Sequence, residues 1–200
     1  MADQKISAMP AAATPLTGTE LVPIVQSGGN VRTTIANFGQ YARSAFSNYG
    51  GFEDTTTQTG STTAGTPFTF NTGDFIANGV TLALNSRLTV AVGGVYNLQW
   101  SAQFQNTDTT PRDVWVWLRI NGANVAGSTG VIGLPARKNP SEPYHSLIGW
   151  NFFVTLTAGQ YVEVVWLKEA AEITVPAYPA NTSPAYPSTA SVVVTLSQVG

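Results

Sequence analysis

The sequence predicts an all-β protein built as an antiparallel sandwich, and three observations carry this prediction. Residues 94–104, GVYNLQWSAQF, alternate apolar and polar side chains without a break, which indicates a strand that buries one face. Similar short apolar segments recur from residue 52 to the end of the sequence. Turn residues, chiefly Gly, Asn and Pro, separate these segments about every ten residues. About eight to ten strands at this spacing indicate a sandwich or a jelly roll.

Most of the expected strands have an apolar face and are bounded by turn residues. Asn121-Gly122 is a strong hairpin signal between two of them. Residues 55–66 are polar and indicate a long loop or an edge strand, whereas residues 134–146 hold three prolines and indicate a surface loop. The expected strands span residues 68–70, 80–84, 88–92, 94–104, 114–120, 125–129, 148–156, 161–168, 173–175 and 191–199.

The first fifty residues differ from the rest and predict a small N-terminal arm. Residues 21–25 have the pattern of a short edge strand. Thr33 or Thr34 then caps a short helix over residues 35–46. A segment of this size cannot build its own core, so we expect it to dock on another surface. The expected division is an arm, residues 1–50, and one β-domain, residues 51–200.

The composition argues against two classes of partner. Charged residues make up 10% of the 200 residues and the net charge is −2, whereas soluble domains usually hold about 25% charged residues. Without clustered Lys and Arg the chain has no surface for phosphates, so we expect no nucleic-acid partner. No run approaches the ~18–20 apolar residues of a membrane span, and the N-terminus lacks the apolar region of a signal peptide. We therefore expect a chain made in the cytoplasm, with no membrane partner.

The residues that carry enzyme chemistry form no catalytic motif. His145 is the single histidine, and with no cysteine in the sequence it is expected to be a surface residue rather than a zinc ligand or triad member. Glu53-Asp54, or Glu169 with Glu172, could form a hydrolase pair or bind calcium. Both pairs have the pattern of solvated surface or edge residues. We therefore predict no enzyme and no cofactor.

The five tryptophans fall into two groups. Three lie on expected core faces: Trp100, Trp150 and Trp166. The other two, Trp115 and Trp117, alternate with a second apolar face, so both faces of this strand cannot enter the same core. The tryptophans could face a sister subunit, a ligand, or a loop or arm of their own chain. Because a large exposed apolar patch is unfavourable on a monomer, we predict that Trp115, Trp117 and Arg119 form a trimer interface.

The tetrapeptide PAYP occurs twice near the end of the chain, at residues 176–179 and 184–187. Its prolines favour stiff, extended backbone, which presents Tyr178 and Tyr186. This segment could grip a neighbouring chain or a sugar, or it could be a long ordered loop. Tyr178 and Tyr186 are therefore the candidates for a partner-binding loop.

Several short motifs, in their order, resemble the C1q/tumour-necrosis-factor-like family. Gly94-Val95-Tyr96 leads into the alternating strand, as in that family, and a later strand ends in Asn121-Gly122. Ala158-Gly159-Gln160 then precedes an apolar strand. One difference is that the last strand is rich in Val, where the family has a Phe-rich strand. The resemblance covers residues 65–200 and implies a homotrimeric, antiparallel jelly-roll β-sandwich.

The first forty residues resemble an N-terminal segment of tailed-bacteriophage fibre, spike and head-decoration proteins. The resemblance rests on residues 6–10, ISAMP, and on residues 16–25, LTGTELVPIV. The closing residues 184–199 are also similar to phage structural proteins of this kind. In such proteins the N-terminal segment usually attaches the protein to the particle.

These resemblances imply a virion structural protein on the outer surface of the particle. The leading hypothesis is a homotrimeric capsid decoration protein or head fibre that binds the major capsid protein through its arm. The alternatives are a receptor-binding tail-fibre tip that recognises a host-surface glycan, and a glycan hydrolase that uses Glu53 or Asp54. The expected anchoring residues are Leu21, Val22, Ile24, Val25, Ile35 and Phe38.

Overall fold

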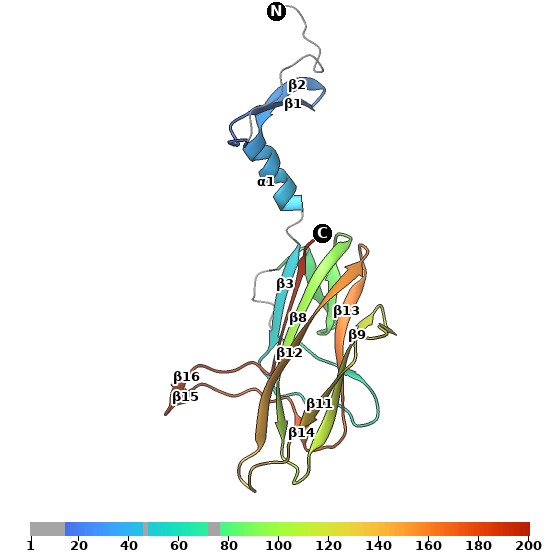
Figure 1. Ribbon diagram of the computed structural model, residues 1–200, viewed down its shortest axis with the longest axis vertical. Helices are drawn as coiled ribbons and strands as arrows, with labels where there is room; N and C mark the ends of the chain where they lie inside the picture. Colours follow the sequence, from blue (N-terminus) through green and yellow to red (C-terminus); the bar gives the residue numbers. More distant parts are fainter. Residues whose placement is uncertain (1–14, 46–47, 72–76) are drawn as a thin grey trace, which may run out of the picture. The chain divides into compact units, whose positions relative to one another are not determined.

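A computed structural model describes residues 15–45, 48–71 and 77–200 and divides the chain into two compact units, residues 1–46 and 47–200 (Figure 1). The division falls a few residues before the expected boundary at residue 50. The motif at residues 6–10 and the expected helix end at Phe46 lie outside the described residues. Within those residues, no helix has the length and apolar character needed to cross a membrane.

The small unit is a β-hairpin followed by a helix. Strands β1 (Leu21–Gln26) and β2 (Gly29–Thr34) pair antiparallel, and α1 spans Ile35–Ala45. Ser27 and Gly28, both with positive φ, form the two-residue turn that suits a right-twisted hairpin. The sequence did not predict β2, because its residues GNVRTT show no apolar alternation. Pairing with β1, rather than burial, makes this segment a strand.

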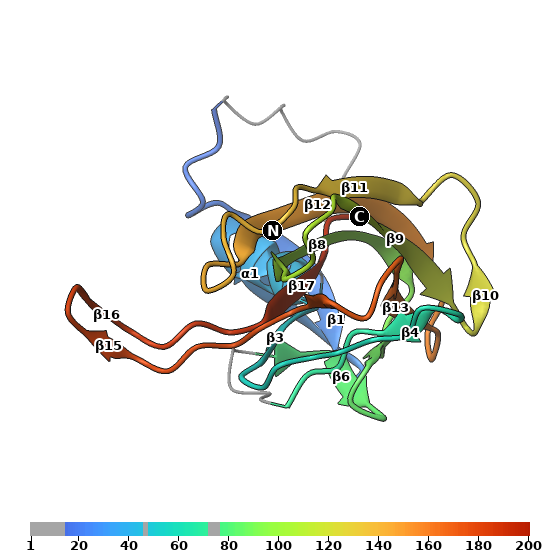
Figure 2. The same cartoon turned by 90° about the horizontal axis from the view of Figure 1, so that it is seen from below.

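The large unit consists of two antiparallel sheets packed face to face, so the predicted all-β sandwich is confirmed (Figure 2). The first sheet contains, in order, β12 (Tyr144–Leu156), β8 (Gly94–Asn106), β17 (Val192–Gln198), β3 (Tyr49–Asp54) and β5 (Ala77–Asn78), with β14 (Ile173–Thr174) also on β8. The second contains, in order, β10 (Ala123–Asn124), β9 (Arg112–Ile120), β13 (Tyr161–Lys168), β7 (Arg87–Val90) and β6 (Val80–Ala83), with β11 (Gly130–Leu134) on β9 and β4 (Thr66–Pro67) on β13.

The connections place strands distant in sequence side by side. The first strand of the unit, β3, lies beside the last, β17, and β7 lies beside β13. The chain changes sheet at most of its connections, from β7 to β8, from β8 to β9 and from β11 to β12.

The core lies between the sheets and is centred on aromatic rings. Phe68 stacks on Trp166 with ring centroids 5.4 Å apart, and Phe104 meets the edge of both rings. Trp100 also packs against Phe68, with ring centroids 6.1 Å apart. Trp100 and Trp166 are therefore core residues, as predicted. Phe68 is fully buried although its segment forms no regular strand.

The prediction that Trp150 is a core residue is wrong, because this side chain is 46% exposed. Trp150 does lie on the inward-facing side of β12, in line with the buried Val154 and Leu156. However, β12 is the edge strand of its sheet, and the space beside Trp150 opens toward β11. The periodicity of a strand reports which face a residue occupies but not how completely the opposite sheet covers it.

The return strand expected at residues 125–129 is also wrong. These residues form a loop between β10 and β11, with Gly127 at positive φ. The Ser128 hydroxyl accepts a hydrogen bond from the Leu118 N–H at 3.0 Å and donates one to the Val125 carbonyl at 2.8 Å. The Ser128 side chain thus satisfies a backbone N–H of β9 that a neighbouring strand would otherwise bond.

Candidate functional site

Trp115 and Trp117 lie on the outer face of the second sheet. The alternate residues of β9 are buried in the core, so the two indole rings point the other way. On the neighbouring strands Trp115 pairs with Leu167 and Val131, and Trp117 pairs with Val165. The expected second apolar face of this strand is therefore present, and both tryptophans are half-buried on it.

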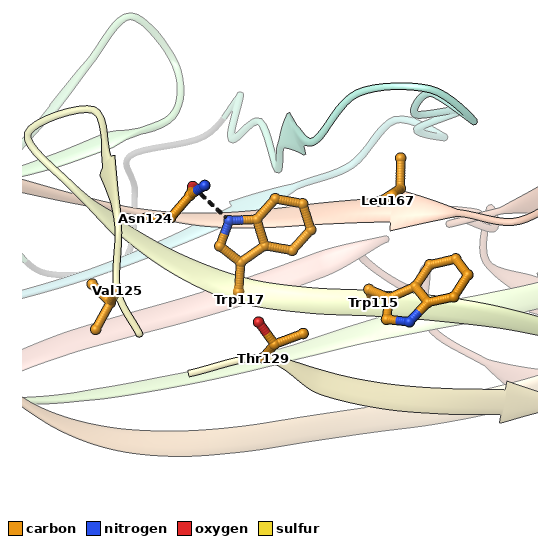
Figure 3. A pocket seen from close by; sticks show the side chains of 6 residues that line it. All are labelled: Trp115, Trp117, Asn124, Val125, Thr129 and Leu167. Atoms are coloured by element: carbon orange, nitrogen blue, oxygen red, sulfur yellow. Dashed lines mark hydrogen bonds between the residues drawn. The ribbon is translucent and has the colours of Figure 1, made fainter. Parts of the chain in front are cut away.

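The two rings line a hollow of about 380 Å³ on this face (Figure 3). They project from alternate positions of β9, with Asn124 beside Trp117 and Leu167 on the adjacent strand. This size lies within the ~300–1,000 Å³ typical of small-molecule sites. We call this hollow the tryptophan pocket; its lining is Trp115, Trp117, Asn124, Val125, Thr129 and Leu167.

The Asn124 carboxamide links Trp117 to Arg119 at one end of the tryptophan pocket. The Asn124 Oδ1 atom accepts a hydrogen bond from Trp117 Nε1 at 2.8 Å and a longer one from Arg119 Nε at 3.4 Å. With its oxygen held by two donors, the amide presents its NH2 group as a free donor. Among the described residues, the hydroxyl of Thr129 and the Nε1 of Trp115 also have no hydrogen-bond partner. The pocket therefore combines two aromatic surfaces with neutral polar groups.

Arg119 is held by its own chain. Its guanidinium lies 3.9 Å from Glu163, a carboxylate that is almost fully buried on the outer face of β13. Glu163 also accepts a hydrogen bond from the Ser86 hydroxyl at 2.9 Å and lies 3.5 Å from Arg87. The Arg87 guanidinium in turn stacks 4.4 Å above the Tyr161 ring. This network fixes Arg119, and through it Asn124, at one end of the tryptophan pocket.

The loop before β4 covers Trp117 from one side. Gly65 lies against the indole so closely that a Cβ at this position would collide with the ring. The tryptophans were expected to face a sister subunit, a ligand, or a loop or arm of their own chain. For Trp117, part of the ring is covered by a loop of its own chain. Trp115, Trp117 and Arg119 do come together on one surface. Their assignment to a trimer interface stays a prediction.

Exposed apolar side chains that the sequence did not predict lie on the neighbouring edge strands β11 and β12 of the two sheets. On β12, Leu147 is 66% and Phe153 is 68% exposed, and Val131 on β11 is 63% exposed. Leu147 and Phe153 face outward from β12, Val131 faces outward from β11 and Trp150 faces inward; we call these four residues the β11–β12 edge. Between the strands lies a hollow of about 540 Å³ that reaches Trp100. The adjacent pair Phe152-Phe153 was the available signal, since two consecutive aromatic residues must occupy opposite faces of a strand.

The two PAYP tyrosines have different surroundings. Tyr178 is half-buried: its hydroxyl donates to Gln105 Oε1 at 2.9 Å and lies 3.2 Å from His145 Nδ1. Burial raises the pKa of Tyr178 above its usual value, with a smaller contribution from Tyr186. Tyr186 lies in the hairpin of β15 (Asn181–Thr182) and β16 (Ala185–Tyr186), which projects from the sandwich (Figures 1 and 2). Of the two, Tyr186 is the more accessible to a partner.

Two of the carboxylates considered for catalysis or calcium, Asp54 and Glu169, have hydrogen-bond partners within the chain. The expectation that Asp54 is solvated is wrong, because it is buried and accepts hydrogen bonds from the Thr56 N–H, the Thr56 hydroxyl and the Thr69 hydroxyl at 2.6–2.9 Å. Glu169 accepts a hydrogen bond from the Asp113 N–H at 2.8 Å. In the described part of the chain, no group of three or more His, Cys, Asp or Glu could hold a metal ion. These contacts give Asp54 a role in fixing the loop that follows β3.

The small unit exposes half of the expected anchoring residues. Leu21, Val25 and Phe38 are each more than half exposed, whereas the side chains of Val22, Ile24 and Ile35 are half-buried. Three of the six lie together on one groove of about 490 Å³: Ile24, Val25 and Phe38. The hairpin and the first turn of the helix form the walls of this groove.

Glu20 holds the turn that precedes the hairpin. Its carboxylate accepts hydrogen bonds from the Thr17 and Gly18 N–H groups and from the Thr17 hydroxyl, at 2.7–2.8 Å. These bonds, those from Thr17 above all, lower the pKa of Glu20 to about 2. The carbonyls of Gly18 and Glu20 then accept the first N–H groups of α1, from Ala36 and Ile35. The motif TGTE is thus a turn that caps the helix.

Searches against protein-family models and against curated proteins find no match to this chain.

Proposed function

We infer that the chain is a structural protein of a tailed-bacteriophage particle, a homotrimeric capsid decoration protein or head fibre that binds the major capsid protein through its N-terminal unit. The observation that carries this proposal is the small unit itself. It is folded, yet its apolar side chains Leu21, Val25 and Phe38 remain largely exposed. Such a unit is suited to docking on a larger surface, since burial there removes apolar area from water.

The bonding within the small unit supports an attachment role. The Glu20 turn, the hairpin and the capped helix are held by hydrogen bonds between residues close in sequence. The unit can therefore present the groove at Ile24, Val25 and Phe38 in a defined shape. Less conformational freedom is then lost on binding than for a disordered tail.

The β11–β12 edge is the surface that we assign to the homotrimer. Leu147 and Phe153 are exposed on the outer face of β12 and Val131 on that of β11, and exposed apolar side chains of this kind can mark subunit contacts. A closed assembly of three subunits would bring this edge of one sandwich against a neighbour. β12 is the outer strand of its sheet and β11 pairs, among the described strands, only with β9, so one side of each strand presents backbone N–H and C=O groups that a neighbouring subunit could cover.

The attachment is tested on particles of the phage that encodes the chain. Immunogold electron microscopy of intact particles is expected to label the head surface. A phage carrying L21S and F38S together is expected to lose most of the label, because two of the three exposed anchoring side chains become polar. The matched control is L84S, which replaces a leucine of the β-domain that is more exposed than Leu21 and Phe38 and is expected to keep the label. Unlabelled wild-type particles would refute the virion assignment.

The homotrimer is tested on the purified full chain by native mass spectrometry. The wild-type chain is expected to give a mass of three subunits. L147S with F153S is expected to give monomers while the melting temperature of the β-domain changes little. A monomeric wild-type chain would exclude the trimer. A trimer that persists in the double variant would place the contact elsewhere, with Trp115 and Trp117 as the next candidates.

A further inference from the structure

We propose that the tryptophan pocket binds a neutral sugar residue, a hexose or an N-acetylhexosamine at the end of a glycan chain. This inference does not rest on the virion assignment. It rests on the pairing of two indole surfaces with a fixed carboxamide and a free hydroxyl, in a hollow of about 380 Å³. Such a volume suits one or two sugar rings rather than a long chain.

The indole rings supply the apolar half of the recognition. One face of a pyranose ring is a row of C–H groups with slight positive charge, and the face of an indole carries the negative part of its quadrupole. Trp115 is half-buried, with Leu167 and Val131 at its sides. Its ring is thus held in place while part of its surface remains accessible. Trp117 is braced by Gly65 in the same way.

The polar groups match a ligand that carries hydroxyls. The Asn124 amide has its oxygen engaged by Trp117 and Arg119, so its NH2 group donates to an incoming oxygen. The Thr129 hydroxyl can donate or accept. A hydroxylated ring would satisfy these groups, whereas a purely apolar ligand would leave them unpaired.

The charges around the pocket exclude an ionic ligand. No charged side chain lines the hollow. The nearest cation, Arg119, is directed to Glu163 and Asn124 instead. An anionic or cationic ligand would lose its hydration without gaining an ion pair. The pocket therefore favours a neutral glycan.

The site is prepared before any ligand arrives. Arg119 is held by the buried Glu163, whose other oxygen contacts Arg87 and Ser86. Asn124 consequently needs no rearrangement to meet a sugar, which lowers the entropic cost of binding. Arg119 and Glu163 act as positioning residues for the pocket.

The test uses the full chain and the methyl glycosides of glucose, galactose, mannose and N-acetylglucosamine as probes. Saturation-transfer NMR is expected to show transfer to the C–H protons of one ring face of at least one glycoside. W115A is expected to weaken this binding about tenfold or more, and W115F to weaken it less, because Phe keeps an aromatic plane. N124D keeps the acceptor for Trp117 but loses the NH2 donor, so it is also expected to weaken binding.

The matched control is Y49A, which removes a partly exposed aromatic ring on β3 in the other sheet. It is expected to bind the glycosides as the wild type does. Wild-type protein that binds none of the four glycosides, or W115A protein that binds them unchanged, would overturn the proposal. A W115A chain that falls apart into monomers would do so as well, because the pocket would then be a contact with a second copy. Native mass spectrometry of each variant measures its oligomeric state and so detects this outcome.

Discussion

The two units of this chain are held together in different ways. The small unit depends on hydrogen bonds between residues close in sequence, such as Glu20 with Thr17 and Thr34 with Asn37. The β-domain depends on contacts between distant residues, such as the stacking of Phe68 on Trp166 and the pairing of β3 with β17. Its apolar side chains are therefore buried, whereas those of the small unit remain at the surface.

This difference shows what a short segment can and cannot do. Too few residues are present in the small unit to enclose a core, so local caps and turns must offset the entropy of ordering it. Its apolar residues are left over and available to a partner. The larger sandwich uses the same residue types to hold itself together, and surplus apolar surface appears mainly at an edge and in a pocket.

The largest effect is expected from the centre of the sandwich. Changing Trp166 to Ala removes a fully buried ring that stacks on Phe68, and it should lower the free energy of unfolding of the β-domain by about 3–5 kcal/mol. W150A changes the same residue type at a half-exposed position and should cost less than half as much. Chemical denaturation followed by tryptophan fluorescence measures both. Equal losses would show that the edge is as well packed as the centre.

A smaller effect is expected from the helix cap. The Thr34 hydroxyl accepts a hydrogen bond from the Asn37 N–H at 3.1 Å, so T34A should destabilise α1 by about 1 kcal/mol and leave the β-domain unchanged. The change is measured by hydrogen exchange of the helix amides. T33A is the control, since the described residues offer its hydroxyl no hydrogen-bond partner. Faster exchange in T33A than in T34A would assign the cap to the wrong threonine.

The smallest effect is expected from the pH response of the Glu20 turn. Hydrogen bonds from Thr17 and Gly18 lower the pKa of Glu20 from 4.5 to about 2 in the folded chain. The turn is therefore fully stabilised above pH 4.5 and loses this contribution as the pH falls through 2. NMR signals of the Thr17 and Gly18 amides should follow that titration. E20Q should abolish it, and a wild-type midpoint near 4.5 would contradict the bonded turn.

Strand periodicity predicted much of the β-domain and located its inward faces. The alternation at Tyr96, Leu98 and Trp100 placed β8 correctly, because burial of one face imposes a period of two on the sequence. The helix and one strand of the arm were also predicted. The strand β2 and the loop at residues 125–129 were not, because hairpin pairing and the Ser128 hydroxyl, rather than apolar pattern, define them.

The candidate site was partly predictable. The surplus apolar face that carries Trp115 and Trp117 follows from the strand pattern, since Val116 and Leu118 must point the other way. Asn124 was not predicted as a partner of Trp117, although the Asn121-Gly122 turn was, because a strand pattern does not specify which side chains of the paired strands bond each other. The exposed edge at Leu147 and Phe153 was missed because edge position depends on which strands pair.

The amino-acid pattern thus specifies local properties of the chain: which residues share a face, where turns occur, and that the face of Trp115 and Trp117 needs cover. Those properties depend on backbone geometry and on neighbours along the chain. Only the tertiary structure shows which residues cover Trp117: Gly65 packs against its ring and Asn124 bonds its Nε1. It also shows that Trp150 lies at an open edge of the sandwich. These contacts join residues brought together by sheet order, and sheet order comes from the packing of the whole domain.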